Sequence, residues 1–156
     1  MVTGGDIVNE HDERTGPFWD AVDGRAPMPP VAGLLGWQLQ EVDPEAGTIV
    51  VRFEGRPEFT NPLGNIQGGM LAAMLDDTMG PALVATLPPG GFAPTLEMKV
   101  TFLQPAVVGP LWGHGRVVKR GGTISFVEAD LVDADGAMIA RASATVRMIT
   151  MPTPPG

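Results

Sequence analysis

The segment that most constrains the fold is residues 67–79, a helix-favouring run within a chain otherwise patterned for strands. It holds no proline before Pro81, and its apolar residues stand at positions 70, 71, 74 and 75, as on a helix. The run is apolar over most of its circumference, which predicts a deeply buried helix. The rest of the chain must therefore supply a layer that wraps around it.

Strand patterns lie on both sides of this helix. Apolar residues alternate strictly over 96–102, which predicts one buried and one solvated face. Further strands are expected at 48–54, 111–118, 123–132 and 138–149, with the period-two pattern beginning at Gly33 and a short helix at 18–22. Gly121-Gly122 and the turn at 133–136 suit hairpins between the last three strands. The prediction is an α+β fold, an antiparallel sheet that wraps one buried helix.

The residue inventory excludes several functions. Cysteine is absent, Ser125 and Ser143 lie in no nucleophile elbow, and the histidines lack metal-ligand spacing, so we expect no metal and no cofactor. Any catalysis must then use carboxylates, amides, hydroxyls and backbone N–H groups. The net charge of −8 disfavours nucleic-acid binding.

The chain is expected to hold one domain, over residues 31–150. Residues 1–30 are expected to form an acidic tail and short helix, and residues 151–156 a Pro-rich tail. No segment has the pattern of a signal peptide or membrane helix, so we expect a cytoplasmic protein with no membrane partner.

Residues 61–69 run directly into the predicted helix and carry its most informative pattern. Gly68 and Gly69 at the helix start leave backbone N–H groups and the positive dipole end open to an anion or a developing oxyanion. The alternative is that both glycines only relieve packing where the helix enters the sheet. The glycines alone do not separate these two hypotheses.

Asp76 stands out because it interrupts the otherwise apolar helix. It follows Gly69, Ala72 and Ala73 at helical spacing, so we expect it on the buried stripe, whereas we expect Asp77 to be solvated. The seven residues from Gly69 to Asp76 span roughly 10 Å, so one helix cannot present both groups to one carbonyl. An antiparallel second copy would do so, which predicts a two-fold homodimer with shared sites.

The pattern Asn61-x-x-Gly64-x-x-Gln67-Gly68-Gly69, followed by Asp76, resembles the signature of hotdog-fold acyl-CoA thioesterases of the phenylacetate-pathway (PaaI-like) group, which is related to 4-hydroxybenzoyl-CoA thioesterases. The likeness covers about residues 30–149 and continues through Leu34-Leu35-Gly36, Thr95-x-x-Met98-x-x-x-Phe102-x-x-Pro105-Ala106, Lys119-Arg120-Gly121-Gly122-Thr123, and Asp135-Gly136 with Ala140. This family folds as a five- or six-stranded antiparallel sheet curled around one long helix.

The resemblance implies roles for the site residues. A backbone N–H of Gly68 or Gly69 would polarise the thioester carbonyl, with Asn61 and Asp76 flanking it. Asp76 would be a general base for water or a nucleophile that forms a mixed anhydride. Thr95 matches a hydroxyl that holds the water or the carboxylate.

Gln67 departs from the family pattern, which usually has His there. An amide can orient a substrate by hydrogen bonding but cannot transfer a proton. This departure favours one alternative, a non-catalytic acyl-CoA-binding module, whereas the presence of Asp76 and Asn61 favours an enzyme. A hotdog hydratase or dehydratase is disfavoured because neither His11 nor His114 lies near the motif.

The CoA portion of such a substrate is anionic, so its site should be basic. Lys119-Arg120-Gly121-Gly122-Thr123 places a basic pair before a flexible turn with free N–H groups, which suits a phosphate. The resemblance adds Arg147 and Phe102 as CoA contacts, and implies that dimers assemble further into tetramers. An adaptable apolar wall for the acyl group is expected from Met70, Met74, Met79 and Met98.

Overall fold

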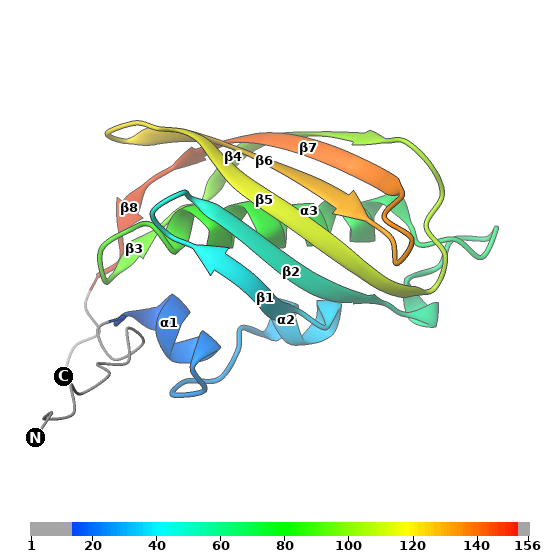
Figure 1. Ribbon diagram of the computed structural model, residues 1–156, viewed down its shortest axis with the longest axis horizontal. Coiled ribbons are helices and arrows are strands. Elements are labelled where there is room, and N and C mark those ends of the chain that lie inside the picture. The colour runs from blue at the N-terminus through cyan, green and yellow to red at the C-terminus, as the bar shows by residue number, and fades with distance from the viewer. Residues whose placement is uncertain (1–13, 153–156) are drawn as a thin grey trace, which may run out of the picture.

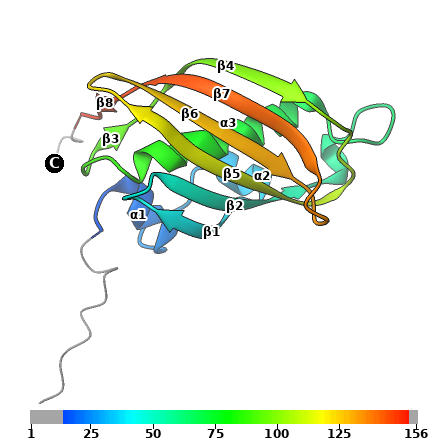
Figure 2. The same cartoon turned by 45° about the horizontal axis from the view of Figure 1, so that its top comes forward.

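The computed structural model describes residues 14–152, so the predicted acidic residues 1–13 and the last four residues lie outside the described part. A six-stranded antiparallel sheet curls around one long helix, α3 (Gly68–Val84), as Figure 1 and Figure 2 show. The predicted α+β fold is confirmed. The strand order across the sheet is β1 (Gln38–Asp43), β2 (Thr48–Gly55), β5 (Gly109–Arg120), β6 (Ile124–Val132), β7 (Met138–Arg147) and β4 (Thr95–Phe102).

Three short helices and two short strands complete the described residues. These are α1 (Pro17–Val22), α2 (Pro30–Leu35), the 3-10 helix η2 (Pro57–Phe59), and the pair β3 (Gly91–Phe92) and β8 (Ile149–Thr150). The expectation of a strand pattern from Gly33 is wrong, because that residue lies inside α2. Pro30 stands in the first turn of α2 and Gly36 ends it with φ of 67°, a pairing of residues typical of a helix start and stop.

Helix α3 continues past its predicted end at residue 79 and contains Pro81. Proline has no N–H, so the carbonyl oxygen of Asp77, four residues earlier, loses its helical donor. The indole Nε1 of Trp37 donates to that oxygen at 2.9 Å. A donor forty residues away in the chain thus replaces the missing bond.

One side of α3 is packed and the other is not. The packed side faces the sheet and buries Leu71, Met74, Leu75, Thr78, Met79, Ala82 and Leu83. Gly69, Ala72, Ala73 and Asp76 lie on the opposite side and are exposed or only half-buried. The expectation that this stripe is buried is therefore wrong for the single chain, because the sheet covers one side of the helix only.

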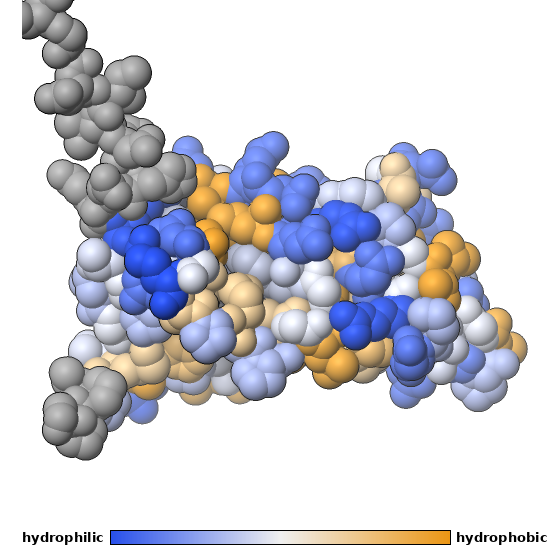
Figure 3. All heavy atoms as spheres, turned by 90° about the horizontal axis from the view of Figure 1, so that it is seen from below, coloured by the Kyte–Doolittle hydropathy of each residue, from blue (hydrophilic) through white to orange (hydrophobic). Residues whose placement is uncertain are grey.

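The apolar face of β4 is also less covered than its alternation predicts. β4 lies at the edge of the sheet and pairs only with β7, so Leu96 and Phe102 remain 58% and 51% exposed. Met98 and Val100 pack partly against the core. Seen from the side of α1 and α2, hydrophobic patches interrupt the hydrophilic surface (Figure 3).

Candidate active site

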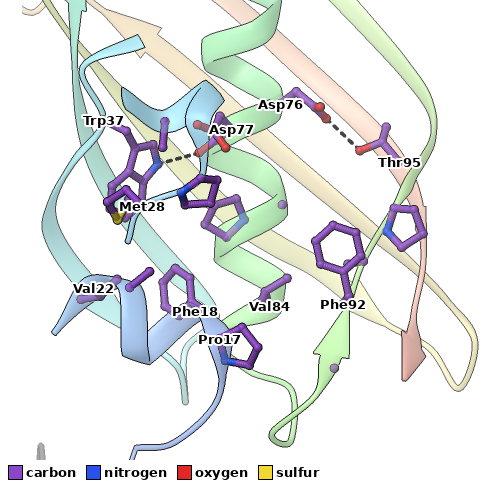
Figure 4. Close-up of a pocket in the computed structure, with 18 of the residues that line it drawn as sticks. Pro17, Phe18, Val22, Met28, Trp37, Asp76, Asp77, Val84, Phe92 and Thr95 are labelled. Carbon is purple, nitrogen blue, oxygen red and sulfur yellow. Dashed lines mark hydrogen bonds between the residues drawn. The ribbon is translucent and has the colours of Figure 1, made fainter. Parts of the chain in front are cut away.

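Asp76 and Thr95 form the centre of the candidate site. Asp76 lies midway along α3, and Thr95 begins β4 beside it. The Thr95 hydroxyl Oγ1 donates to Asp76 Oδ1 at 2.8 Å (Figure 4). This bond fixes one carboxylate oxygen of Asp76 and leaves the other, Oδ2, available to a water or a substrate.

Both residues line a cavity of about 490 Å³, which is within the size range of small-molecule sites. The cavity lies between α1, α2, the second half of α3 and the start of β4, and most of its lining is apolar. That lining includes Pro17, Phe18, Val22, Met28, Trp37, Val84 and Phe92. The predicted methionine wall is wrong, because Met74 and Met79 face the sheet and are fully buried in the core. Met70 and Met98 also lie outside the lining.

Asp77 lines the same cavity, and the expectation that it is solvated is wrong. Its Oδ2 is buried and has no hydrogen-bond partner among residues 14–152. Burial, and secondly the charge of Asp76, raise the pKa of Asp77 to about 6. The sequence held one indication of this environment, Pro81 four residues later, because a proline inside a helix frees the Asp77 carbonyl to accept a donor from outside the helix.

The start of α3 carries the two glycines of the predicted oxyanion site. Within the described part of the chain, no group accepts a hydrogen bond from the N–H of Gly68 or Gly69. A Cβ on Gly68 would lie 3.1 Å from the Phe102 ring, so close packing explains this glycine. A Cβ on Gly69 would meet nothing within 4 Å, so packing in the single chain does not explain the second.

Asn61 and Gln67 lie near these glycines. Asn61 Oδ1 accepts the N–H groups of Leu63 and Asn65 at 2.9 and 3.2 Å, so this oxygen organises the loop that enters α3. The side chain of Gln67 is exposed and makes no capping bond to the helix. Phe102 lies at this end of α3, against Gly68. It does not lie beside residues 119–123, the basic hairpin, with which the family resemblance groups it as a CoA contact.

The basic hairpin lies at the opposite end of α3. Arg120 Nη1 donates to the carbonyl of Thr86 at 2.9 Å, just beyond the helix end. The N–H of Gly121 donates to Ser125 Oγ at 3.2 Å, so the expectation that this amide is free is wrong. Lys119 and Thr123 are exposed and Gly122 has open space around it. Arg147 is exposed and pairs in register with Ile124, which follows the hairpin.

The predicted site residues therefore form three separate groups in one chain. Asp76 lies eight residues from Gly68, which is about 12 Å along the helix axis. The basic hairpin lies farther on, past the C-terminal end of α3. One chain thus does not place a carboxylate, an oxyanion site and a phosphate site around one substrate carbonyl.

Comparison with known proteins assigns the chain to a family. Residues 63–140 match the Thioesterase superfamily. The chain belongs to that superfamily. This thioesterase is 41% identical to a phenylacetic acid degradation-related protein of Ralstonia eutropha JMP134, whose crystal structure superposes with a TM-score of 0.80 over 83% of this chain and 98% of that one.

Two further relatives of this thioesterase are known from sequence. Human acyl-coenzyme A thioesterase 13 is 30% identical over 69% of this chain and 77% of its own length. A protein of Saccharolobus solfataricus that is named as an esterase is 35% identical over 67% of this chain and 74% of its own length. The chain is accordingly a PaaI-like hotdog thioesterase, an enzyme that hydrolyses thioesters.

Over residues 14–152, no cluster of three or more His, Cys, Asp or Glu side chains could hold a metal ion. None of the helices in the same range combines the length and apolar character that a membrane span requires.

Proposed function

We propose that this thioesterase hydrolyses acyl-CoA thioesters, with the acyl group bound in the cavity beside Asp76. The observation that carries the proposal is a carboxylate, held by Thr95, at the wall of an otherwise mostly apolar cavity of about 490 Å³. Such a cavity suits an apolar acyl group with its carbonyl at the carboxylate. The human relative, whose name states acyl-coenzyme A thioesterase activity, supports the same substrate class.

Asp76 serves as general base in this proposal. It takes a proton from a water while the water oxygen bonds to the thioester carbonyl carbon; the C–S bond then breaks, and the CoA thiolate leaves and is protonated. In the nucleophilic alternative, an Asp76 oxygen bonds to that carbon and expels the thiolate, and water then hydrolyses the mixed anhydride. Label from oxygen-18 water in the Asp76 carboxylate after turnover would establish the anhydride route, because direct attack of water on the thioester places no label there.

The oxyanion that forms on the carbonyl requires donors, and the N–H groups at Gly68 and Gly69 of a second subunit supply them. The stripe of Gly69, Ala72 and Ala73 consists of small residues that the rest of the chain covers only in part, so a second α3 can approach it closely. An antiparallel partner helix would place its first turn opposite Asp76. The exposed apolar edge of β4 supports a homodimer on the same side.

Lys119, Arg120 and Arg147 are proposed to hold the CoA phosphates. They lie at the C-terminal end of α3, and an antiparallel partner brings that end of one helix toward the first turn of the other. Arg120 also binds the Thr86 carbonyl, so it contributes to local structure as well. Phe102, which contacts Gly68, would then lie beside the thioester rather than the nucleotide.

The test is thiol release from a panel of acyl-CoA thioesters, with Asp76→Asn as the comparison. We expect hydrolysis by the wild type and its loss in the variant. Tight acyl-CoA binding without thiol release by the wild type would instead favour the non-catalytic binding module that Gln67 permits. Mixing Asp76→Ala chains with chains that carry a bulky residue at Gly68 should restore activity if the site is shared between subunits.

A further inference from the structure

Asp77 is a cavity-lining carboxyl group that the proposed reaction does not use. Figure 4 shows its neighbour Asp76 pointing toward Thr95, while Asp77 points toward the side of the cavity that α2 and Trp37 close. Successive residues of a helix point about 100° apart, so the two carboxylates address different parts of one cavity. The Trp37 bond to the Asp77 carbonyl anchors the backbone at this position.

The carboxylate of Asp77 lacks partners within the protein. Its Oδ2 is enclosed and unpaired, and no side chain or backbone group of the described part donates to Oδ1. Since Oδ1 is not enclosed in the same way, it is the oxygen that a molecule in the cavity can reach. A buried carboxylate without donors is costly, and a bound donor would offset that cost.

Within residues 14–152, the lining of the cavity supplies no positive charge to compensate Asp77. Among the residues that line it, Asp76 and Asp77 are the charged ones, and both are acidic. The Asp76 carboxylate already accepts the Thr95 hydroxyl, whereas the Asp77 carboxylate accepts no hydrogen bond from the described residues. A hydrocarbon acyl group would cover Asp77 and leave it unpaired.

We propose that Asp77 is a specificity residue of the acyl cavity, and that its carboxylate selects acyl groups that carry a hydrogen-bond donor over plain hydrocarbon acyl groups. This inference rests on the proposed function, since it concerns the substrate of that same site. The donor must lie within a few carbons of the thioester carbonyl, because Asp77 adjoins Asp76 in the chain. A hydroxyl fulfils this chemistry without disturbing the apolar lining.

The test compares hexanoyl-CoA with 3-hydroxyhexanoyl-CoA and 6-hydroxyhexanoyl-CoA, which differ from it by one hydroxyl. We expect the wild type to show a kcat/KM about tenfold higher for 3-hydroxyhexanoyl-CoA than for hexanoyl-CoA, as one good hydrogen bond to a charged group allows. 6-Hydroxyhexanoyl-CoA, whose hydroxyl lies at the far end of the chain, should gain less. Asp77→Leu should reverse this preference by raising kcat/KM for hexanoyl-CoA and lowering it for the hydroxylated substrate. Asp77→Asn, whose amide oxygen still accepts, should lie between them.

Controls separate this inference from folding and from the proposed function. Glu45→Gln removes an exposed carboxylate outside the cavity and should keep the wild-type preference. A thermal melt of each variant identifies loss of folding, and Asp77→Asn carries the test if the leucine variant is unfolded. Equal kcat/KM values for all three thioesters in the wild type, or equal losses on all three in folded Asp77 variants, would overturn the role of Asp77. Absence of any thioester hydrolysis by the wild type would instead overturn the proposed function.

Discussion

The two sides of α3 differ in their packing and in their chemical role. The side toward the sheet is closely packed. Thr78 is fully buried there, and its Oγ1 donates a hydrogen bond to the Met74 carbonyl at 2.7 Å. The opposite side holds Asp76 and Asp77, two carboxyl groups that the chain covers only in part and satisfies only in part. One helix therefore stabilises the fold through one side and presents reactive groups through the other.

The difference teaches where changes should affect stability and where they should affect activity. Close packing leaves no room for added atoms, so substitutions on the sheet side act on folding. Unpaired polar groups lower stability, but they are free to bind substrate or to transfer protons. Substitutions on the cavity side should therefore change turnover, substrate specificity and the pH dependence of stability.

The largest effect is expected at Asp76. Asp76→Asn removes the proposed base or nucleophile but keeps the shape of the side chain, so kcat for a good acyl-CoA should fall on the order of 10²-fold or more. The unfolding temperature should change little. Thiol-release kinetics and a thermal melt check both expectations. Full activity in the variant would contradict the claim that the cavity side of α3 carries the catalytic group.

Asp77 should make stability depend on pH. Because its pKa is raised to about 6 from an ordinary 3.8, the native state holds this proton more tightly than the unfolded state does. The contribution of Asp77 therefore falls as pH rises from about 4 to about 6, by at most about 3 kcal/mol. Asp77→Asn should remove this decline, as urea unfolding at pH 4.5 and pH 7.5 would measure.

A further pair of substitutions compares the sides directly through packing. A Cβ on Gly113 of β5 would lie 2.1 Å from Thr78 Oγ1, so Gly113→Ala should lower stability by about 1–3 kcal/mol. Gly69→Ala on the opposite side meets open space in the single chain and should leave stability equal or slightly higher. The same change should lower kcat if a partner subunit and an oxyanion approach that backbone; a stable and fully active Gly69→Ala enzyme would contradict the shared site.

The smallest effect is expected at the basic hairpin. Lys119→Ala should raise KM for an acyl-CoA a few-fold and leave kcat nearly unchanged, because a phosphate contact binds ground and transition states alike. The salt dependence of KM should also become weaker. Lys99→Ala, which removes an exposed lysine from β4, is the matched control. A collapse of kcat at Lys119 with KM unchanged would argue against a phosphate site.

Much of this fold could be predicted because its signals are local. The apolar run before Pro81 predicts the central helix, and Gly121-Gly122 and Asp135-Gly136 predict hairpins that the β5–β6 and β6–β7 pairings confirm. Period and turn chemistry depend on residues near one another in the chain, so one sequence is enough to read them. The family resemblance, rather than a local signal, implied that the Thr95 hydroxyl holds either the water or the carboxylate, and the structure shows its hydrogen bond to Asp76.

The coverage of each face was decided by tertiary structure alone. Helical spacing placed Asp76 on one stripe and Asp77 beside it, but the sheet closed over the other side of α3, and α2 with Trp37 closed over Asp77. The same holds for β4, whose alternation is real but whose place at the sheet edge leaves its apolar face open. Sequence determines which residues share a face, because that follows from backbone geometry; whether the face is buried depends on segments tens of residues away, and only the folded chain brings them together.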